Sequence, residues 1–334
     1  MNEVIVAEHL VREFKVPAPA AERPARRGGL TGLFGSRKTV LRVVDDVSFA
    51  IRRGEFVGYL GPNGAGKSTT IKMLSGVIVP TSGTVEVLGR EPYRHRQANA
   101  RSIGVLFGQR SQLWWDLQLI ESFRLLAHIY GIPRTVYEER LAAFTEVLQL
   151  GHILHMPVRQ LSLGQRMCGD IAASLLHGPE ILFLDEPTIG LDIVAKANIQ
   201  AFLRKINEEL NVTVILTTHN VDDIEKLCKR VIFIDHGKVI YDGSMADMAA
   251  AYGDHRYLVV DTGGWVPGEE EWHGPEIART EESKLWFRIE DSDHLAPMIG
   301  LLNERLPIRD LTVKEPGIEE IVRSIYSRRA YANA

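Results

Sequence analysis

The sequence predicts an α/β core followed by a small α+β domain, and three observations support this. Strand-like and helical segments alternate over the first two-thirds of the chain. The runs 181–184 and 212–217 are continuously apolar or β-branched, which is typical of parallel strands covered on both faces. Beyond residue 250 the order changes to several strands separated by single helices.

The expected elements follow the chain in order. The alternating start, MNEVIVAEHLVREFKV, predicts an antiparallel β part, and the Pro-, Gly- and Arg-rich residues 17–38 predict an insertion. In the core we expect strands at 55–60, 103–107, 181–184 and 212–217, and helices at 69–75, 135–150 and 193–209. In the second domain we expect strands at 255–260, 285–289 and 308–314, helices at 293–305 and 318–326, and a loop at 261–276.

Composition narrows the class of protein. The formal net charge is −4 over 334 residues, so no basic field favours nucleic acid, and we expect no nucleic-acid partner. The two cysteines, Cys168 and Cys228, have neither disulfide-framework nor metal spacing, which fits a reducing compartment. The start differs from a signal peptide and no run of about 18 apolar residues occurs, so we expect a cytosolic chain.

A glycine-rich loop between a predicted strand and a predicted helix matches the pattern G-x-x-x-x-G-K-[ST]. In such a loop, glycines let backbone N–H groups converge on phosphate oxygens, Lys67 adds a positive charge, and Ser68 can ligate Mg²⁺. The flanking strand and helix make a chance glycine-rich turn the weaker interpretation. The residues of this predicted phosphate loop are Gly61, Pro62, Asn63, Gly64, Ala65, Gly66, Lys67, Ser68 and Thr69.

Acidic residues end the next buried strand. Asp185 at a strand tip requires a positive partner, and Mg²⁺ at the phosphate loop would supply it. Glu186 would then polarise an attacking water, although alone it could be a solvated loop acid. His219 ends a strand that we expect at the same sheet edge, where it could bind a γ-phosphate or hold water in line.

These motifs occur in a fixed order with LSLGQ (161–165) and GLD (190–192). Together they resemble the nucleotide-binding subunit of ABC transporters over residues 1–245. The resemblance implies a P-loop NTPase core with a mostly parallel sheet, an antiparallel N-terminal part and a helical subdomain at about 110–178. It also implies a nucleotide-binding domain at 1–250, a C-terminal accessory domain at 251–334, and ATP with Mg²⁺ as ligands.

The resemblance also implies functions for single residues. Ser162, Gly164 and Gln165 would face the γ-phosphate of ATP held by a second copy, and Asp192 would communicate across that dimer. Leu163 replaces a glycine of the common LSGGQ form without altering the contacting residue types.

Two further assignments follow from the same resemblance. Gln109 would sense Mg²⁺ and the attacking water, with Gln112 as the weaker candidate for that position. Phe14 would stack on adenine, although a core position fits its pattern nearly as well.

More narrowly, the chain resembles the ATPases of efflux-type ABC systems, which work with one or two separate membrane permease subunits at the cytoplasmic face of the membrane. The stretch FGQRSQLWWDL contains Trp114 and Trp115, which would either pack the helical subdomain or receive a permease helix. The competing hypothesis is a soluble ABC-type ATPase that acts as a regulatory binder through its C-terminal domain. Long coiled-coil insertions and a second motif set, as in DNA-repair and translation ABC proteins, are lacking in this sequence.

Overall fold

The computed structural model describes residues 2–17, 38–108, 111–218, 220–252, 256–267, 272–289, 295–315 and 321. Gln109, His219, nearly all of the predicted insertion and the helix predicted at 318–326, except Ile321, lie outside these residues. The chain divides into two compact units, 1–243 and 244–334. The boundary predicted at residue 250 falls within helix α8 (Met245–Tyr252) of the second unit and stays a prediction.

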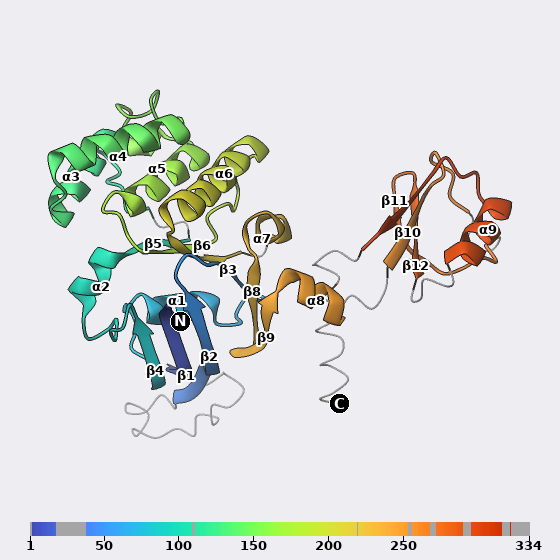
Figure 1. Ribbon diagram of the computed structural model, residues 1–334, viewed down its shortest axis with the longest axis horizontal. Coiled ribbons are helices and arrows are strands. Elements are labelled where there is room, and N and C mark those ends of the chain that lie inside the picture. Colours follow the sequence, from blue (N-terminus) through green and yellow to red (C-terminus); the bar gives the residue numbers. More distant parts are fainter. Residues whose placement is uncertain are drawn as a thin grey trace, which may run out of the picture. The chain divides into compact units, whose positions relative to one another are not determined.

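A six-stranded sheet forms the centre of the first unit, with the strand order β5-β6-β7-β3-β8-β9 (Figure 1). The first five strands of this order pair in parallel, and β3, β6 and β7 are buried along their whole length. This burial on both faces accounts for their continuous apolar runs. The strands are β3 (Phe56–Leu60), β5 (Ile103–Phe107), β6 (Ile181–Asp185), β7 (Thr213–Thr217), β8 (Arg230–Asp235) and β9 (Lys238–Ser244).

A second sheet of three antiparallel strands has the order β2-β1-β4. Its strands are β1 (Glu3–Pro17), β2 (Lys38–Arg52) and β4 (Ser82–Val87). Helix α1 (Lys67–Leu74) contacts β2 and β4 on one side and β6 on the other, so it lies between the two sheets (Figure 1). Ile71, Met73 and Leu74 of this helix are fully or almost fully buried in the core that the two sheets share.

Helices complete the first unit. The helical subdomain contains α3 (Leu119–Tyr130), α4 (Arg134–Val147), a short 3₁₀ turn (Val158–Gln160) and α5 (Leu163–Leu175). The other helices are α2 (Arg96–Ser102), α6 (Ile193–Leu210) and α7 (Val221–Leu227). The predicted P-loop NTPase fold, with its antiparallel part and helical subdomain, is thereby confirmed.

The second unit is α+β, as predicted. Its sheet has the order β11-β12-β10-β13, with strands β10 (Arg256–Asp261), β11 (Ile277–Glu281), β12 (Lys284–Ile289) and β13 (Asp310–Lys314). Helix α9 (Leu295–Arg305) packs Leu302 into the core of this sheet. The sequence did not predict β11, where three of five residues are exposed. In the described residues, every helix is too short or too polar to cross a bilayer.

Candidate functional site

The phosphate loop connects β3 to α1, as the sequence predicts, and borders a cavity of about 190 Å³. Its Gly61 and Ala65 lie outside the lining, and Ala65 is buried beneath the loop. Val43 of β2 joins the lining, and Glu186 reaches it from the end of β6. The lining residues are Val43, Pro62, Asn63, Gly64, Gly66, Lys67, Ser68, Thr69 and Glu186.

Gly66 is required by the local backbone. Its φ of 106° is one that L side chains rarely adopt, and a Cβ at this position would lie 2.7 Å from the carbonyl oxygen of Val43. Helix α1 begins directly after it and has no side-chain cap, so the first N–H groups of the helix stay available to a ligand at its N-terminus.

Lys67 occupies the first turn of α1 and is 7% exposed. Its ammonium donates to the carbonyl oxygens of Gly61 at 2.7 Å and Pro62 at 3.1 Å. Burial lowers the pKa of Lys67, while the negative charges of Glu186 and Asp185 raise it. The lysine is therefore held against the loop by neutral acceptors, beside two carboxylates.

Three strand ends meet beside this loop. Asp185 of β6 lies opposite Phe107 of β5 and Thr217 of β7 in the parallel register. The Thr217 hydroxyl donates to Asp185 Oδ1 at 2.5 Å, and the Gly108 N–H donates to the Asp185 carbonyl at 3.0 Å. The chain segments that lead to residues 109 and 219 thus begin on either side of Asp185.

Glu186 adopts a left-handed backbone with φ of 56°, and its N–H donates to the Thr217 carbonyl at 2.9 Å. Non-glycine residues in this conformation carry a local energetic cost, and they cluster at functional sites. Glu186, directly after the tip of β6, lies in the lining of the phosphate cavity, while Asp185 is 8% exposed.

A buried carboxylate bonds the chain segments that follow β6 and β7. Asp223 of α7 accepts from the hydroxyl of Thr188 at 2.5 Å and from the amide of Gln200 at 2.6 Å. The Thr218 hydroxyl donates to the same carboxylate at 3.4 Å, and the ammonium of Lys196 lies at 3.4 Å. Asp223 therefore connects the segment after β6 with the segment after β7.

The LSLGQ segment forms the start of α5. Ser162 caps the helix: its hydroxyl accepts from the Gln165 N–H at 3.2 Å, and the Gln165 side chain accepts from the Ser162 N–H at 2.9 Å. This reciprocal capping box leaves the Ser162 hydroxyl proton available to an acceptor. Ser162 is exposed.

The GLD segment packs against this helix start. Asp192 is the N-cap of α6 and accepts from the Ala195 N–H at 2.9 Å. A Cβ at Gly164 would lie 3.1 Å from the Cβ of Ala195, and a Cβ at Gly190 would lie 3.1 Å from Leu163 Cδ2. Leu163, which replaces a glycine of the common form, thus fills the space beside Gly190.

Phe14 lines a different cavity, of about 410 Å³, and not the phosphate cavity. The Arg12 guanidinium carbon lies 4.6 Å from the centre of its ring, and Phe14 pairs with Leu41 across β1 and β2. Strand β2 contributes Val40 to the Phe14 cavity and Val43 to the phosphate cavity. Phe14 is half-buried beside an open cavity, which is compatible with stacking on a planar ligand.

Known proteins are similar to this chain in sequence and in fold. Residues 44–189 match the family described as ABC transporter. The linearmycin resistance ATP-binding protein LnrL of Bacillus subtilis (strain 168) is 30% identical over 299 residues, which cover 86% of this chain and 94% of LnrL. The ABC transporter ATP-binding protein NatA of the same organism is 32% identical over 215 residues, which cover 64% of this chain and 87% of NatA.

The chain belongs to the ABC transporter family.

Other relatives in the ABC transporter family differ from this chain in length. The probable multidrug ABC transporter ATP-binding protein YbhF of Escherichia coli (strain K12) is 37% identical over 221 residues, which cover 66% of this chain. The match spans 37% of the length of YbhF. A solved ATP binding subunit of an ABC transporter has a TM-score of 0.61 and 28% identity, covering 75% of this chain and 93% of that one.

Two residues predicted for the ABC catalytic site, Gln109 and His219, lie outside the described residues, so their positions stay predictions. The alternative candidate, Gln112, points elsewhere: its side-chain amide donates to the carbonyl of Asp170 in α5 at 3.0 Å. Gln112 thus holds the helical subdomain together, which favours Gln109 as the glutamine of the ABC site.

The tandem tryptophans of the ABC chain are both exposed, Trp114 at 39% and Trp115 at 53%. The neighbouring Leu113 is 6% exposed and is the apolar anchor of this segment. The Arg166 guanidinium carbon lies 5.5 Å from the centre of the Trp115 ring. Packing inside the subdomain therefore accounts for Leu113 and leaves both indole rings accessible.

Sequence reasoning did not identify Val43, Thr217 or Asp223 as parts of the site. Val43 belongs to the antiparallel sheet and reaches the phosphate loop only through the tertiary fold. Thr217 is a buried polar residue at the end of a strand, and Asp223 is a buried acid in a helix. Buried polar side chains need hydrogen-bond partners, and this requirement is the signal that could have identified both residues.

Proposed function

We propose that this chain is the ATP-hydrolysing subunit of an ABC transporter, in which ATP binding closes a head-to-tail dimer that drives a separate permease. The observation that carries the proposal is the meeting of the phosphate loop with the acid-tipped strand β6 around one cavity. The loop N–H groups, the N-terminus of α1 and Lys67 suit the phosphates of ATP.

The residues at this edge also fit a magnesium ion. Ser68 lines the cavity. Asp185 is almost buried, and its bond from Thr217 comes from a neutral hydroxyl, so a bound cation would compensate the negative charge of Asp185. Oxygen donors of this kind are the ligands that Mg²⁺ prefers. Bound there, Mg²⁺ would neutralise charge on the phosphates.

Hydrolysis then requires an orienting group for water. Glu186 borders the cavity and would polarise the attacking water, as a hydrogen-bond acceptor for its proton. Gln109 and His219 would align water and γ-phosphate, since the segments leading to them begin beside Asp185. ATP and water thereby become ADP and phosphate, chiefly through positioning and charge stabilisation.

A second copy completes each nucleotide site in this proposal. Ser162 is exposed and capped at the start of α5, so its hydroxyl and the free N–H groups of the first turn can meet the γ-phosphate of the partner copy. Asp192 is exposed next to this segment. At 24% identity, the dimeric ATP-binding cassette bound to ADP and Pi, with a TM-score of 0.59, supports only the likeness of fold.

The experiment that tests this function uses Glu186→Gln. The substitution keeps the size of the side chain and removes its basicity, so ATP should bind but turn over at least about 100-fold more slowly. Size-exclusion chromatography with Mg²⁺ and ATP should then show a stable dimer. The matched variant Ser162→Arg places a positive side chain at the dimer contact and should remain monomeric in the Glu186→Gln background. A Glu186→Gln chain that stays monomeric at saturating ATP would refute the proposal.

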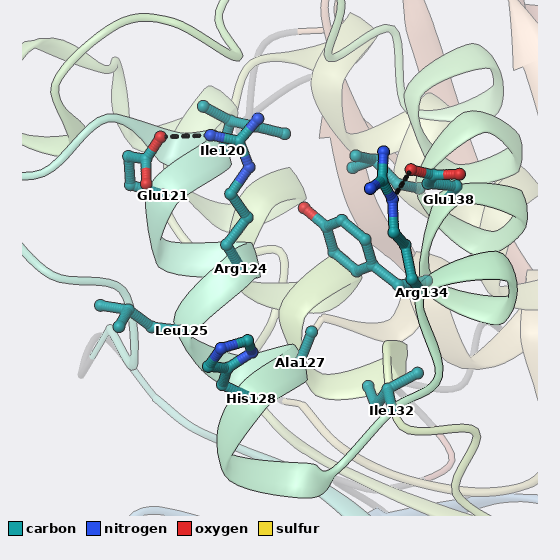
Figure 2. Close-up of a pocket in the computed structure, with 11 residues that line it drawn as sticks. Ile120, Glu121, Arg124, Leu125, Ala127, His128, Ile132, Arg134 and Glu138 are labelled. Carbon is teal, nitrogen blue, oxygen red and sulfur yellow. Dashed lines mark hydrogen bonds and ion pairs between the residues drawn. The ribbon is translucent and has the colours of Figure 1, made fainter.

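We also propose that the permease docks on the helical subdomain. A cavity of about 720 Å³ lies between α3 and α4, with Ile120, Leu125 and Ile132 among its apolar lining (Figure 2). The ion pairs Glu121–Arg124 and Arg134–Glu138 flank it, at 2.6 and 2.7 Å. Apolar side chains bordered by charges suit an amphipathic helix, and the tandem tryptophans add exposed aromatic area on the same subdomain.

Replacing the tryptophans tests this docking. We expect Trp114→Ala and Trp115→Ala to reduce co-purification with the membrane subunits at least about tenfold, since exposed aromatics often dominate interfaces. The free energy of unfolding of the isolated chain should change by less than about 1 kcal/mol, because both rings are accessible. Trp265→Ala, at an exposed site of the second unit, is the control and should leave co-purification intact.

The efflux direction and the cytoplasmic face of the membrane are part of the same proposal. Relatives named for multidrug transport and linearmycin resistance support it. Uptake or release of labelled drugs in inside-out vesicles that contain the purified complex would test the direction.

A further inference from the structure

Asp170 is a buried carboxylate in the middle of α5 that the proposed reaction does not use. It is 3% exposed, and its neighbours on the buried face of the helix, Met167 and Ile171, are apolar. Burying a carboxylate is costly unless hydrogen bonds or opposite charge compensate. A carboxylate at this position therefore needs a structural explanation.

The hydrogen bonds to its side chain come from one short loop, and Arg166 of α5 adds a favourable positive charge. The Ser111 hydroxyl and the Gln112 N–H both donate to Asp170 Oδ1, each at 2.9 Å. The Gln112 side-chain amide donates to the Asp170 carbonyl at 3.0 Å, and the Leu113 N–H donates to the Ser111 hydroxyl at 3.2 Å. Ser111 and Gln112 are thus bonded directly to Asp170 of α5, and Leu113 is bonded to Ser111.

The same loop is tied to the chain just before α5. We call residues 111–118 the strap. The Arg159 N–H donates to the Trp115 carbonyl at 3.0 Å, and the Val158 N–H donates to the Leu117 carbonyl at 2.9 Å. The strap is therefore bound on both sides of Ser162, by the 3₁₀ turn before it and by Asp170 two helical turns after it.

The strap and the start of α5 lead to different nucleotide sites. The strap continues the chain from Gly108, whose N–H is bonded to Asp185 in the chain's own phosphate site. In the proposed dimer, Ser162 meets the nucleotide of the other copy. In sequence, the bonds between the strap and α5 therefore lie between Gly108, beside the chain's own phosphate site, and Ser162, which the proposed dimer places at the site of the other copy.

We propose that Asp170 is a positioning residue that clamps the strap to α5, so that ATP in the chain's own site sets the orientation of Ser162 toward the site of the partner copy. This inference rests on the proposed function. It assigns to Asp170 no contact with ATP, and it predicts that loss of the clamp uncouples the two sites without weakening ATP binding to either.

The test uses the full chain and three substitutions. Asp170→Leu fills the space and removes the acceptor, whereas Asp170→Asn keeps an oxygen for the Ser111 and Gln112 donors. Arg140→Met is the matched control, because Arg140 donates to the Leu176 carbonyl at 2.7 Å at the opposite end of α5. For each we would measure unfolding temperature, binding of a fluorescent ATP analogue by the monomer, and the steady-state ATPase rate against ATP concentration.

We expect a wild-type Hill coefficient approaching about 2, the number of coupled sites. Asp170→Leu should lower kcat about tenfold and bring the Hill coefficient to about 1, with analogue binding within about twofold of wild type. Asp170→Asn should restore most of both parameters, and Arg140→Met should leave the Hill coefficient unchanged.

Several results would overturn the inference. A folded Asp170→Leu chain with wild-type kcat and Hill coefficient shows that the clamp couples nothing, and an equal loss in Arg140→Met shows a general effect of destabilising α5. If Asp170→Leu does not fold, Ser111→Ala decides, and wild-type kinetics for it reject the clamp. If the wild-type chain binds ATP but never hydrolyses it, both the proposed function and this inference are rejected. If the wild-type chain hydrolyses ATP cooperatively and the Asp170 variants keep its kcat and Hill coefficient, the inference alone is rejected.

Discussion

At the scale of single residues, Asp185 and Glu186 show how neighbouring acids acquire different chemistry. Asp185 ends β6 in extended conformation and is held by the Thr217 hydroxyl, so its carboxylate is fixed. Glu186 turns the chain with a positive φ and reaches the cavity. A carboxylate that is held in place can serve as a metal ligand, whereas a carboxylate at the cavity wall can contact water.

Asp170 leads to a prediction about pH. Burial raises the pKa of Asp170 from 3.8 to about 6, against the hydrogen bonds from Ser111 and Gln112 that lower it. Because the folded pKa lies above the unfolded one, folding favours the protonated carboxyl, and this stability is lost as pH rises through about 6. Wild type should therefore lose up to about 3 kcal/mol relative to Asp170→Asn between pH 4 and pH 7.

Urea unfolding of both chains across this range would measure the effect. The difference between the two curves isolates Asp170, because every other titrating group is common to both proteins. A difference that does not vary with pH would show that the carboxyl is not protonated more readily in the folded chain.

At the scale of elements, the contact between β6 and β7 holds the edge of the sheet beside the phosphate loop. Thr217→Val is nearly isosteric and removes the hydroxyl that donates to Asp185. We expect a loss of about 1–3 kcal/mol in the free energy of unfolding, since the buried carboxylate loses its partner. ATPase activity should also fall, because Asp185 is then free to rotate.

Thr213→Val provides the comparison at the other end of the same strand. There the Thr213 hydroxyl accepts from the Gly54 N–H at 2.9 Å, far from the phosphate loop. This variant should be destabilised to a similar extent but keep wild-type turnover per folded molecule. Equal losses of turnover in both variants would show that β7 contributes only stability.

The elements also show what the sequence can predict. The buried strands and the phosphate loop were predicted because their signals are local: continuous apolar runs and a motif of eight residues. Strand β11 was not predicted, because only its end residues, Ile277 and Glu281, are partly buried. The Asp170 clamp joins residues 58 and 59 positions apart, and only the tertiary fold brings such residues together.

At the scale of the whole molecule, the two units have separate hydrophobic cores. We expect calorimetry to resolve two unfolding transitions, one for each unit. Mg²⁺ and ATP at about 100 times the dissociation constant should stabilise the first unit alone, by about 2.7 kcal/mol, because the phosphate cavity lies entirely within it.

Two results would contradict this prediction. A single transition would show that the units unfold cooperatively, and a shift of both transitions with nucleotide would show that ligand binding is transmitted to residues 244–334. Scans with ADP, which lacks the γ-phosphate, serve as the control for effects that need dimer closure.

The left-handed turn at Glu186 has a consequence for protein engineering. Glycine adopts this conformation without the steric cost that glutamate carries, so Glu186→Gly should raise the free energy of unfolding by up to about 1 kcal/mol. The same substitution removes the carboxylate proposed to act on water. A library screened for thermal resistance alone would therefore enrich inactive chains, and only selection for turnover would retain the glutamate.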